Sequence, residues 1–404
     1  MLTRRIATEI AAKCNGAYVI DLNVVESNYY RLLNAFKRLW ANTTIAYSYK
    51  TNYNRAICQT LHKAGAKAEV VSMFEYQYAK SNRIADEDIV FNGLIKHPDT
   101  SALIALKGGI VNVDNLRELE ELEEYAKRHE VRLNIGLRLD PCFNDTVDSR
   151  FGIRVGSDDY RKAKNLLMAS EHLICVGVHS HYKRRSLEDY KARVEGLIEA
   201  SKELHATDFI DIGSGVFSEM PEGFGDRFGD RPTFEQYAEV ACNTLKEHGV
   251  SKSTKLILEF GLPIVANAVS YVTHVADIKT DKNVNRVQTY CSKFLVISPA
   301  LFGNLPVIVY GNSDSTAPAE DYALVGFTCV EEDLLAKYHG RIDIGDIIVF
   351  GNVGAYTQSF APNFILPEPP TYAVKGNDFW LVKRSTALHD ILCKYVNDKE
   401  GAIW

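Results

Sequence analysis

Short apolar segments alternate with longer amphipathic segments along the first two thirds of the chain. The apolar segments have the length and β-branched composition of strands, and they occupy residues 17–22, 44–50, 68–72, 88–93, 109–114, 132–139, 174–181, 208–215 and 255–260. Apolar residues at helical spacing mark intervening segments such as 24–40, 116–129 and 186–205. Strands that alternate with helices pair in parallel through right-handed crossovers. Eight such units in about 250 residues predict an α/β fold, a closed (β/α)8 TIM-like barrel.

A second pattern begins near residue 269, where strand-like segments follow one another with few helices between them. They occupy residues 270–280, 286–294, 305–311, 322–329, 346–351 and 371–384, and they predict a mostly antiparallel β domain. A chain of 404 residues also exceeds what one hydrophobic core usually organises. We therefore expect a barrel over residues 20–266 and a C-terminal β domain over 267–404, completed by the N-terminal segment 1–19.

The composition limits the partners and the compartment. Acidic and basic residues are interleaved and sum to a net charge of -6, so no positive field is available to hold a nucleic-acid backbone. No apolar run has the length of a signal peptide or a membrane span. The eight cysteines form no CxxC pair and no disulfide framework. We expect a cytoplasmic protein with reduced cysteines, no nucleic-acid partner and no membrane association.

Reactive side chains of a (β/α)8 barrel gather at the carboxyl ends of its strands. Several predicted strands end in residues suited to chemistry, namely Lys50, His181, Gly213, Gly215 and Glu259. The mostly apolar residues that precede Lys50 predict that its side chain is partly buried. Burial lowers the pKa of an amine, and the neutral amine is a nucleophile that can form an imine with an aldehyde. Small residues in the glycine turn let backbone N–H groups approach a phosphate. A buried Glu259 needs a partner, and a protonated pyridine nitrogen is one.

Each of these residues also has an ordinary interpretation. A lysine at a strand end is usually solvated, a glycine pair often marks a simple turn, and His179 and His181 suit core packing or a metal site. For the metal, no carboxylate or cysteine stands at ligand spacing, whereas one imidazole is enough to stack on a flat cofactor. Together these residues predict pyridoxal 5′-phosphate (PLP) as the cofactor. They supply an amine that can form an imine, glycines that can approach a phosphate, an acid that can pair with a pyridinium and an imidazole that can stack on the ring.

At these residues the chain resembles the fold-type III PLP decarboxylases, the ornithine/arginine/diaminopimelate decarboxylase family, whose fold is an alanine-racemase-like barrel followed by a β domain. AYSYKTN is similar to the family's Y-A-x-K-x-N, which makes Lys50 the Schiff-base lysine. VGVHSH resembles G-x-H-x-H and implies that His181 stacks on the cofactor. LEFGLPIVANA resembles E-P-G-R-x-x-V-A-x-A, which assigns Glu259 to the pyridine nitrogen and Gly261 to the cofactor contacts.

Three further barrel motifs extend the resemblance. DIGSGV is similar to D-I-G-G-G-F and implies a cofactor-binding turn of Gly213, Ser214 and Gly215, with serine replacing the middle glycine. AEVVSMFEYQYA stands where the family has F-D-x-A-S-x-x-E, with Glu69 in place of the acid near the cofactor. RFGI corresponds to K-F-G-I, and Arg138 stands where the preceding barrel strand of the family carries an arginine.

The β domain carries two more matches. GFTC resembles G-P-T-C, which makes Cys329 a catalytic and substrate-binding cysteine, contributed across a homodimer interface to the site of the other subunit. GAYT resembles G-A-Y, in which Tyr356 reaches the cofactor phosphate and lies near the substrate. From the residues alone, both would be assigned to the core.

Two departures from the family pattern bear on the substrate and the cofactor. Leu262 stands where the family has the arginine of E-P-G-R, and HYKRR replaces H-V-G-S, so Arg184 or Arg185 is expected to restore positive charge. Val330 stands where the family usually has an acid that reads a distal ammonium, and the candidate substitutes are Glu331, Glu332 and Asp333. A shift by one residue normally points a side chain elsewhere.

The resemblance implies α-decarboxylation of an amino acid or amino-acid derivative, with release of carbon dioxide and an amine. Glu259 keeps the pyridine nitrogen protonated, and Cys329 or Lys50 returns a proton to Cα. Because of the departures, a siderophore or antibiotic precursor or a carrier-protein-tethered aminoacyl group is expected rather than simple ornithine, lysine or meso-diaminopimelate. The alternatives are a racemase on the same barrel, a non-catalytic homologue that binds a regulatory protein, and a metal-dependent hydrolase.

Overall fold

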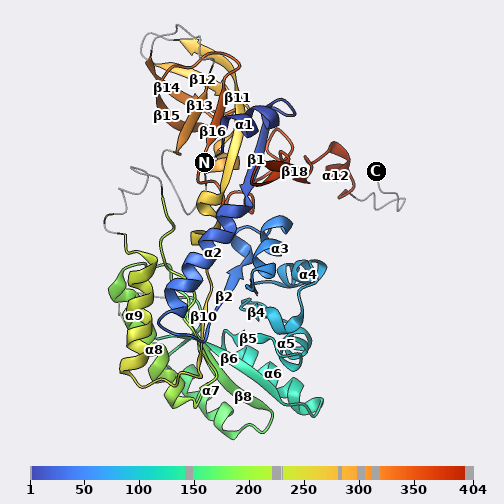
Figure 1. The fold of residues 1–404 in the computed structure, drawn as a ribbon. Helices are drawn as coiled ribbons and strands as arrows, with labels where there is room; N and C mark the ends of the chain where they lie inside the picture. The colour runs from blue at the N-terminus through green and yellow to red at the C-terminus, as the bar shows by residue number, and fades with distance from the viewer. Residues whose placement is uncertain are drawn as a thin grey trace, which may run out of the picture.

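Two β-sheets organise the chain, and Figure 1 shows the barrel and the β domain connected where β1 (Gly16–Asp21) leads into α2 (Leu22–Lys37) and where the segment after β10 (Lys255–Leu258) leads into β11 (Val269–Thr280). The structure is a computed structural model, and it describes residues 2–141, 149–220, 229, 231–280, 284–297, 305–311 and 319–395. The blue-to-green two thirds of the chain forms the barrel, while the yellow-to-red last third forms most of the β domain (Figure 1). The predicted fold class, a (β/α)8 barrel followed by a mostly antiparallel β domain, is confirmed.

The barrel strands follow the predicted alternation. They are β2 (Thr43–Ser48), β3 (Lys67–Val70), β4 (Ile89–Phe91), β5 (Ile110–Val113), β6 (Leu133–Asp140), β8 (Leu173–His179), β9 (Phe209–Asp211) and β10 (Lys255–Leu258). They pair in parallel in the order β5-β4-β3-β2-β10-β9-β8-β6, and a pairing between β5 and β6 closes the ring. A short strand, β7 (Ile153–Arg154), pairs in parallel with the end of β6. All carboxyl ends therefore meet at one mouth.

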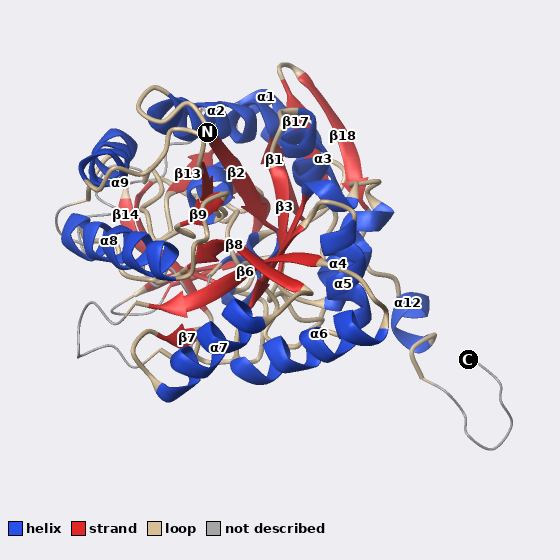
Figure 2. Cartoon of the chain, turned by 90° about the horizontal axis from the view of Figure 1, so that it is seen from below, coloured by secondary structure: helices blue, strands red, loops and turns tan. Residues whose placement is uncertain are grey.

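Helices surround these strands, as the view in Figure 2 shows. They are α2 (Leu22–Lys37), α3 (Arg55–Lys63), α4 (Met73–Ser81), α5 (Pro98–Leu106), α6 (Leu116–Arg128), α7 (Asp158–Ala169), α8 (Leu187–Glu203) and α9 (Phe234–Glu247). Polar side chains accept a hydrogen bond from the first turn of most of them, as Ser186 does for α8. Across the described residues, no helix combines the length and apolar character needed to cross a membrane.

The barrel interior is filled by the ring of Phe209, which packs with Ala46, Val90 and Ile257 from neighbouring strands. The neighbouring strand β8, in which Gly177 is paired with Phe209, makes room for the ring with a glycine. A Cβ on Gly177 would lie 2.4 Å from the ring. Apolar packing at this depth excludes water from the floor below the strand ends.

The second sheet belongs to the β domain. Its strands are β1 (Gly16–Asp21), β11 (Val269–Thr280), β12 (Asn285–Thr289), β13 (Val307–Tyr310), β14 (Glu320–Val325), β15 (Leu334–Gly340), β16 (Ile347–Phe350), β17 (Thr371–Lys375) and β18 (Asp378–Lys383). Most pairs are antiparallel, with parallel pairing between β1 and β17 and between β12 and β14. The helices of this part are α1 (Arg4–Ala11), α11 (Lys293–Val296) and α12 (Leu388–Leu392).

One predicted barrel strand lies elsewhere. The segment 17–22, the first of nine candidates, forms most of β1, which pairs antiparallel with β11 and parallel with β17. Its burial explains the difference, because both faces of β1 are covered and a buried central strand has the same continuous apolar pattern in either sheet. The N-terminal segment therefore contributes to the second sheet, while the domain limits at residues 20 and 266 stay a prediction.

We expect Phe209→Ala to lower the free energy of unfolding by about 3–5 kcal/mol, because it leaves a cavity in a packed barrel interior. Urea denaturation followed by circular dichroism measures this change. Ile344→Ala is the control, because that side chain is 67% exposed and its loss should change stability by less than about 0.5 kcal/mol. A Phe209→Ala protein as stable as the control would show that the ring does not support the barrel.

Candidate active site

A cavity of about 880 Å³ opens at the carboxyl ends of the barrel strands. Five of the residues selected from the sequence line it, namely Lys50, Glu69, Arg138, His181 and Glu259. They come from five different strands or strand ends, so the closure of the barrel brings them together.

The amine of Lys50 donates a hydrogen bond to the carboxylate of Glu69, which is fully buried. Strand pairing places the two together, because Ser48 of β2 is in register with Glu69 of β3. Burial acts against the charged amine, but the carboxylates of Glu69 and Glu259 outweigh it and raise the pKa of Lys50 above its usual value. The lowered pKa expected from the sequence was wrong, because that argument considered burial without the acid on the neighbouring strand.

Glu259 follows β10 and is 1% exposed. Its Oε2 lies 3.2 Å from His179 Nε2 and 3.3 Å from His181 Nδ1. Burial favours the protonated acid, but the charge and hydrogen bonds of the two histidines hold the pKa of Glu259 well below its usual range. A protonated pyridine nitrogen in a water-poor barrel needs an ionised partner, and the carboxylate of Glu259 can be that partner.

The same three residues correct one step of the sequence argument. His179, His181 and Glu259 each offer a ligand atom, and these atoms lie within 4.8 Å of one another. A carboxylate distant in sequence therefore does accompany the histidine pair. The sequence argument considered only ligand spacing along the chain, and this carboxylate reaches the histidines across the barrel.

Asn92 was missed in the sequence, although it directly follows β4 at the same mouth. Its side-chain amide donates to Oε1 of Glu259 and, at 3.2 Å, to Oε1 of Glu69. Asn112 in turn donates to the amide oxygen of Asn92 at 2.8 Å and so orients it. The acid assigned to the ring nitrogen and the acid beside the lysine are thus joined by one oriented amide.

The turn after β9 has the backbone that its two glycines allow. Gly213 has φ +63° and Gly215 has φ +93°, and a Cβ on either would lie within 3 Å of backbone oxygens of Ser180 or Tyr182. The N–H of Ser214, between them, lies 3.3 Å from His181 Nδ1. That nitrogen either accepts from Ser214 or donates to Glu259, depending on its tautomer.

Arg138 sits at the edge of the cavity, where it is paired. Its Nη1 lies 3.2 Å from Asp114, and its guanidinium lies 4.8 Å from the ring centre of Phe151. Asp114 also accepts a hydrogen bond from the N–H of Gly152 at 3.2 Å. The segment that corresponds to K-F-G-I is thereby attached to the arginine strand.

Gly261 and Tyr356 meet at Thr51, next to Lys50, and neither is part of the cavity wall. A Cβ on Gly261 would lie 2.0 Å from the hydroxyl of Thr51, so glycine is needed for this contact. The N–H of Tyr356, at φ +59°, donates to the carbonyl of Thr51 at 2.9 Å. The β domain therefore packs directly on the lysine segment.

Cys329, Glu331 and Glu332 do not meet the other predicted residues within one chain. All three are exposed on the segment between β14 and β15, and the wall of the cavity does not include them. Asp333, the third candidate for the acid that binds a distal ammonium, is 3% exposed. It accepts hydrogen bonds from Thr328 at 2.6 Å and from the N–H of Lys293 at 2.7 Å, so it holds the fold of this segment.

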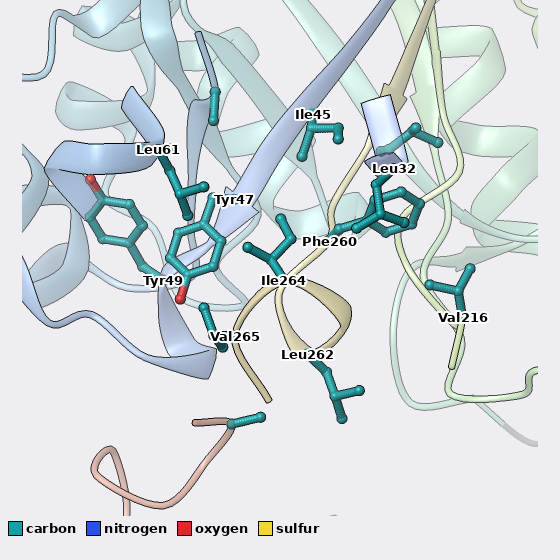
Figure 3. Close-up of a cluster of buried hydrophobic side chains, with 14 of the residues drawn as sticks. Leu32, Ile45, Tyr47, Tyr49, Leu61, Val216, Phe260, Leu262, Ile264 and Val265 are labelled. Atoms are coloured by element: carbon teal, nitrogen blue, oxygen red, sulfur yellow. The ribbon is translucent and has the colours of Figure 1, made fainter. Parts of the chain in front are cut away.

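The position of the missing arginine is apolar and buried. Figure 3 shows Leu262 on the short helix α10 (Leu262–Val265), together with Ile264 and Val265. Arg184 lines the cavity and lies 3.3 Å from Asp189, while Arg185 lies 5.0 Å from the ring centre of Phe217. No charge therefore stands at residue 262.

The residues at this mouth fit PLP. Lys50 presents an amine to the cavity, and Glu259 presents an ionised oxygen pair. The turn after β9 holds two glycines at positive φ, a backbone conformation whose successive N–H groups can form a concave binding site for an anion such as a phosphate.

Comparison with known proteins agrees with this fit. The family model described as "Pyridoxal-dependent decarboxylase, pyridoxal binding domain" matches residues 25–266. The diaminopimelate decarboxylase of Methanocaldococcus jannaschii is 27% identical and is aligned over 96% of this chain and 93% of its own length. The diaminopimelate decarboxylase of Archaeoglobus fulgidus is 25% identical, over 93% of this chain and 92% of its own.

Solved structures extend the agreement to the fold. A crystal structure of diaminopimelate decarboxylase from M. jannaschii has a TM-score of 0.85 at 25% identity and covers 98% of this chain and 95% of its own. The arginine decarboxylase of Paramecium bursaria Chlorella virus, bound to agmatine, has a TM-score of 0.76 at 17% identity, covers 92% of this chain and 100% of its own, and shares the fold. The chain therefore belongs to the pyridoxal-dependent decarboxylases, and it is a PLP-dependent carboxy-lyase that acts on an amino acid.

Proposed function

We propose that the cavity around Lys50 is the site of α-decarboxylation, and that the substrate is an amino-acid derivative with a modified or tethered distal end. The observation that carries the site is the buried connection from Lys50 through Glu69 and Asn92 to Glu259. It joins the amine that would hold the cofactor to the acid that would face the ring nitrogen.

Individual residues have distinct roles in this proposal. Lys50 holds the cofactor, Gly213, Ser214 and Gly215 receive its phosphate through backbone N–H groups, and His181 covers its ring. Gly261, Arg138 and Tyr356 complete the cofactor contacts. When bound, PLP supplies an electron sink for the electron pair that the departing carboxylate leaves.

Proton transfer depends on the acids and the amine. Glu259, ionised by its histidine partners, holds a proton at the ring nitrogen of the cofactor. Glu69 accepts a hydrogen bond from Lys50 and can take up the proton that a charged amine must lose before it acts as a nucleophile. Cys329 of a second subunit, or Lys50 itself, returns a proton to Cα.

The proposed substrate class rests on the missing acid that would bind the distal ammonium of the substrate. Val330 is apolar where the family usually has an acid, and Asp333 is used by its own segment. An α-amino acid with a free distal ammonium would therefore find fewer charged partners than in the family pattern. A siderophore or antibiotic precursor, or an aminoacyl group on a carrier protein, does not need an acidic partner for a free distal ammonium. The cytoplasmic location stays a prediction.

The experiment is carbon dioxide release from single enantiomers of meso-diaminopimelate, lysine, ornithine and a panel of N-acylated or carrier-bound derivatives. We expect a derivative to have the highest kcat/KM. Diaminopimelate as the best substrate would contradict the proposed substrate class. Formation of the mirror-image amino acid without carbon dioxide would indicate racemisation instead.

The lysine is tested by Lys50→Ala. Loss of the amine should remove the visible absorbance of bound PLP and lower carbon dioxide release by about 10³-fold or more. Lys67→Ala is the matched control, because this lysine of the neighbouring strand is also ion-paired, at 3.1 Å from Asp88, but lies outside the cavity wall. An unchanged absorbance in Lys50→Ala would remove the basis of the proposal.

Shared sites are tested by mixing two inactive proteins, Lys50→Ala and Cys329→Ala, under conditions that exchange subunits. If each site combines a lysine from one subunit with a cysteine from the other, mixed dimers contain one intact site, and about a quarter of the wild-type activity should return. Lys50→Ala mixed with Glu259→Gln is the control, because both residues lie in one barrel and no intact site forms. Activity equal in the two mixtures would argue against the homodimer proposal.

A further inference from the structure

A buried arginine lies against the glycine turn, and the family resemblance assigns it no role. Arg193 is on α8 and is 1% exposed. Its Nη2 donates to the carbonyl of Ser214 at 2.7 Å, and its Nη1 donates to the carbonyl of Tyr182 at 3.5 Å. Its Nε has no hydrogen-bond partner in the part of the chain that the structure describes.

No carboxylate in the described part of the chain forms an ion pair or a hydrogen bond with Arg193. Among the described residues its hydrogen-bond partners are backbone carbonyls, and the ring of Tyr190 lies 4.6 Å from the guanidinium carbon. The nearby acid Asp211 does not supply the charge, because burial and Glu259 raise its pKa well above its usual range. Burial lowers the pKa of Arg193, and the carboxylate of Glu259 offsets this burial only from a distance. A buried cation without an anion in direct contact costs free energy, which favours an anionic ligand beside it.

The geometry directs this charge at the turn. A Cβ on Gly215 would lie 3.3 Å from Arg193 Nη1, so the guanidinium lies immediately beneath the glycine. In a trans peptide the N–H and the carbonyl point in opposite directions. Because Arg193 binds the carbonyl of Ser214, the N–H of Gly215 is turned away from it, toward the other side of the turn.

We propose that Arg193 replaces the positive charge that is missing at Leu262. From beneath the turn it orients the Ser214–Gly215 peptide and stabilises the dianionic phosphate of the cofactor. Arg184 and Arg185, the substitutes expected from the sequence, are engaged with Asp189 and the ring of Phe217. Arg193 is a positioning residue for cofactor phosphate binding.

The test compares the affinities of the apoenzyme for PLP and for pyridoxal, which lacks the phosphate. Arg193→Gln removes the charge and keeps a polar side chain, so the preference for PLP over pyridoxal should fall by about tenfold or more. Arg193→Lys keeps the charge and should retain most of that preference. Affinity is measured by the absorbance of bound cofactor, independently of turnover.

Arg4→Gln is the matched control. Arg4 also donates to a backbone carbonyl, that of Gly311 at 2.9 Å, and also lies over a tyrosine ring, at 5.6 Å from the centre of Tyr310. It is in the β domain, and its replacement should leave both affinities unchanged. An unchanged preference in Arg193→Gln, or an equal loss of affinity for PLP and pyridoxal, would overturn the proposal and leave Arg193 a structural role.

A measurement on the unmodified holoenzyme decides the matter if the variants do not fold. A free phosphate monoester takes up its second proton near about pH 6. A buried guanidinium beneath the turn should keep the bound phosphate dianionic, so its ³¹P resonance should stay constant from about pH 5 to 8. A resonance that titrates near pH 6 in the holoenzyme would contradict the proposed role of the arginine.

Discussion

The buried carboxylate of Glu259 is the group around which the catalytic end of the barrel is arranged. An acid at this depth stays ionised because two histidines and an asparagine, all from other strands, converge on its two oxygens. Each of these partners lies at a strand end, and the partners meet because the barrel is closed. The need to keep one negative charge in a water-poor interior therefore links the topology of the fold to its chemistry.

Charge is distributed unusually around the cofactor site. The loop after β10 has an apolar residue at 262, which packs in the core. A cation appears instead on α8, beneath the turn that follows β9. Under the proposed role of Arg193, electrostatic balance at the cofactor does not require a charge at a particular position along the chain.

Among the described residues, the wall of the cavity is formed by the barrel, and Cys329 of the β domain is exposed outside it. The segment that carries Cys329 is folded around Asp333 and exposes its tip. In contrast, Tyr356 docks on Thr51, next to Lys50 of the same chain. The β domain thus has one face that supports its own barrel and one loop that is available to another subunit, in agreement with the proposed homodimer.

The alternation of strand and helix patterns determined the barrel, and local motifs determined which strand ends carry the lysine, the glycine turn and the acid. Tertiary structure decided what depends on neighbours in space. The segment 17–22 has the apolar pattern of any buried strand, and pairing with β11 and β17 assigned it to the second sheet. The pKa of Lys50 rises because Glu69 lies on the adjacent strand. Asn92 and Arg193 gained their roles from contacts across the barrel, which no spacing along the chain encodes.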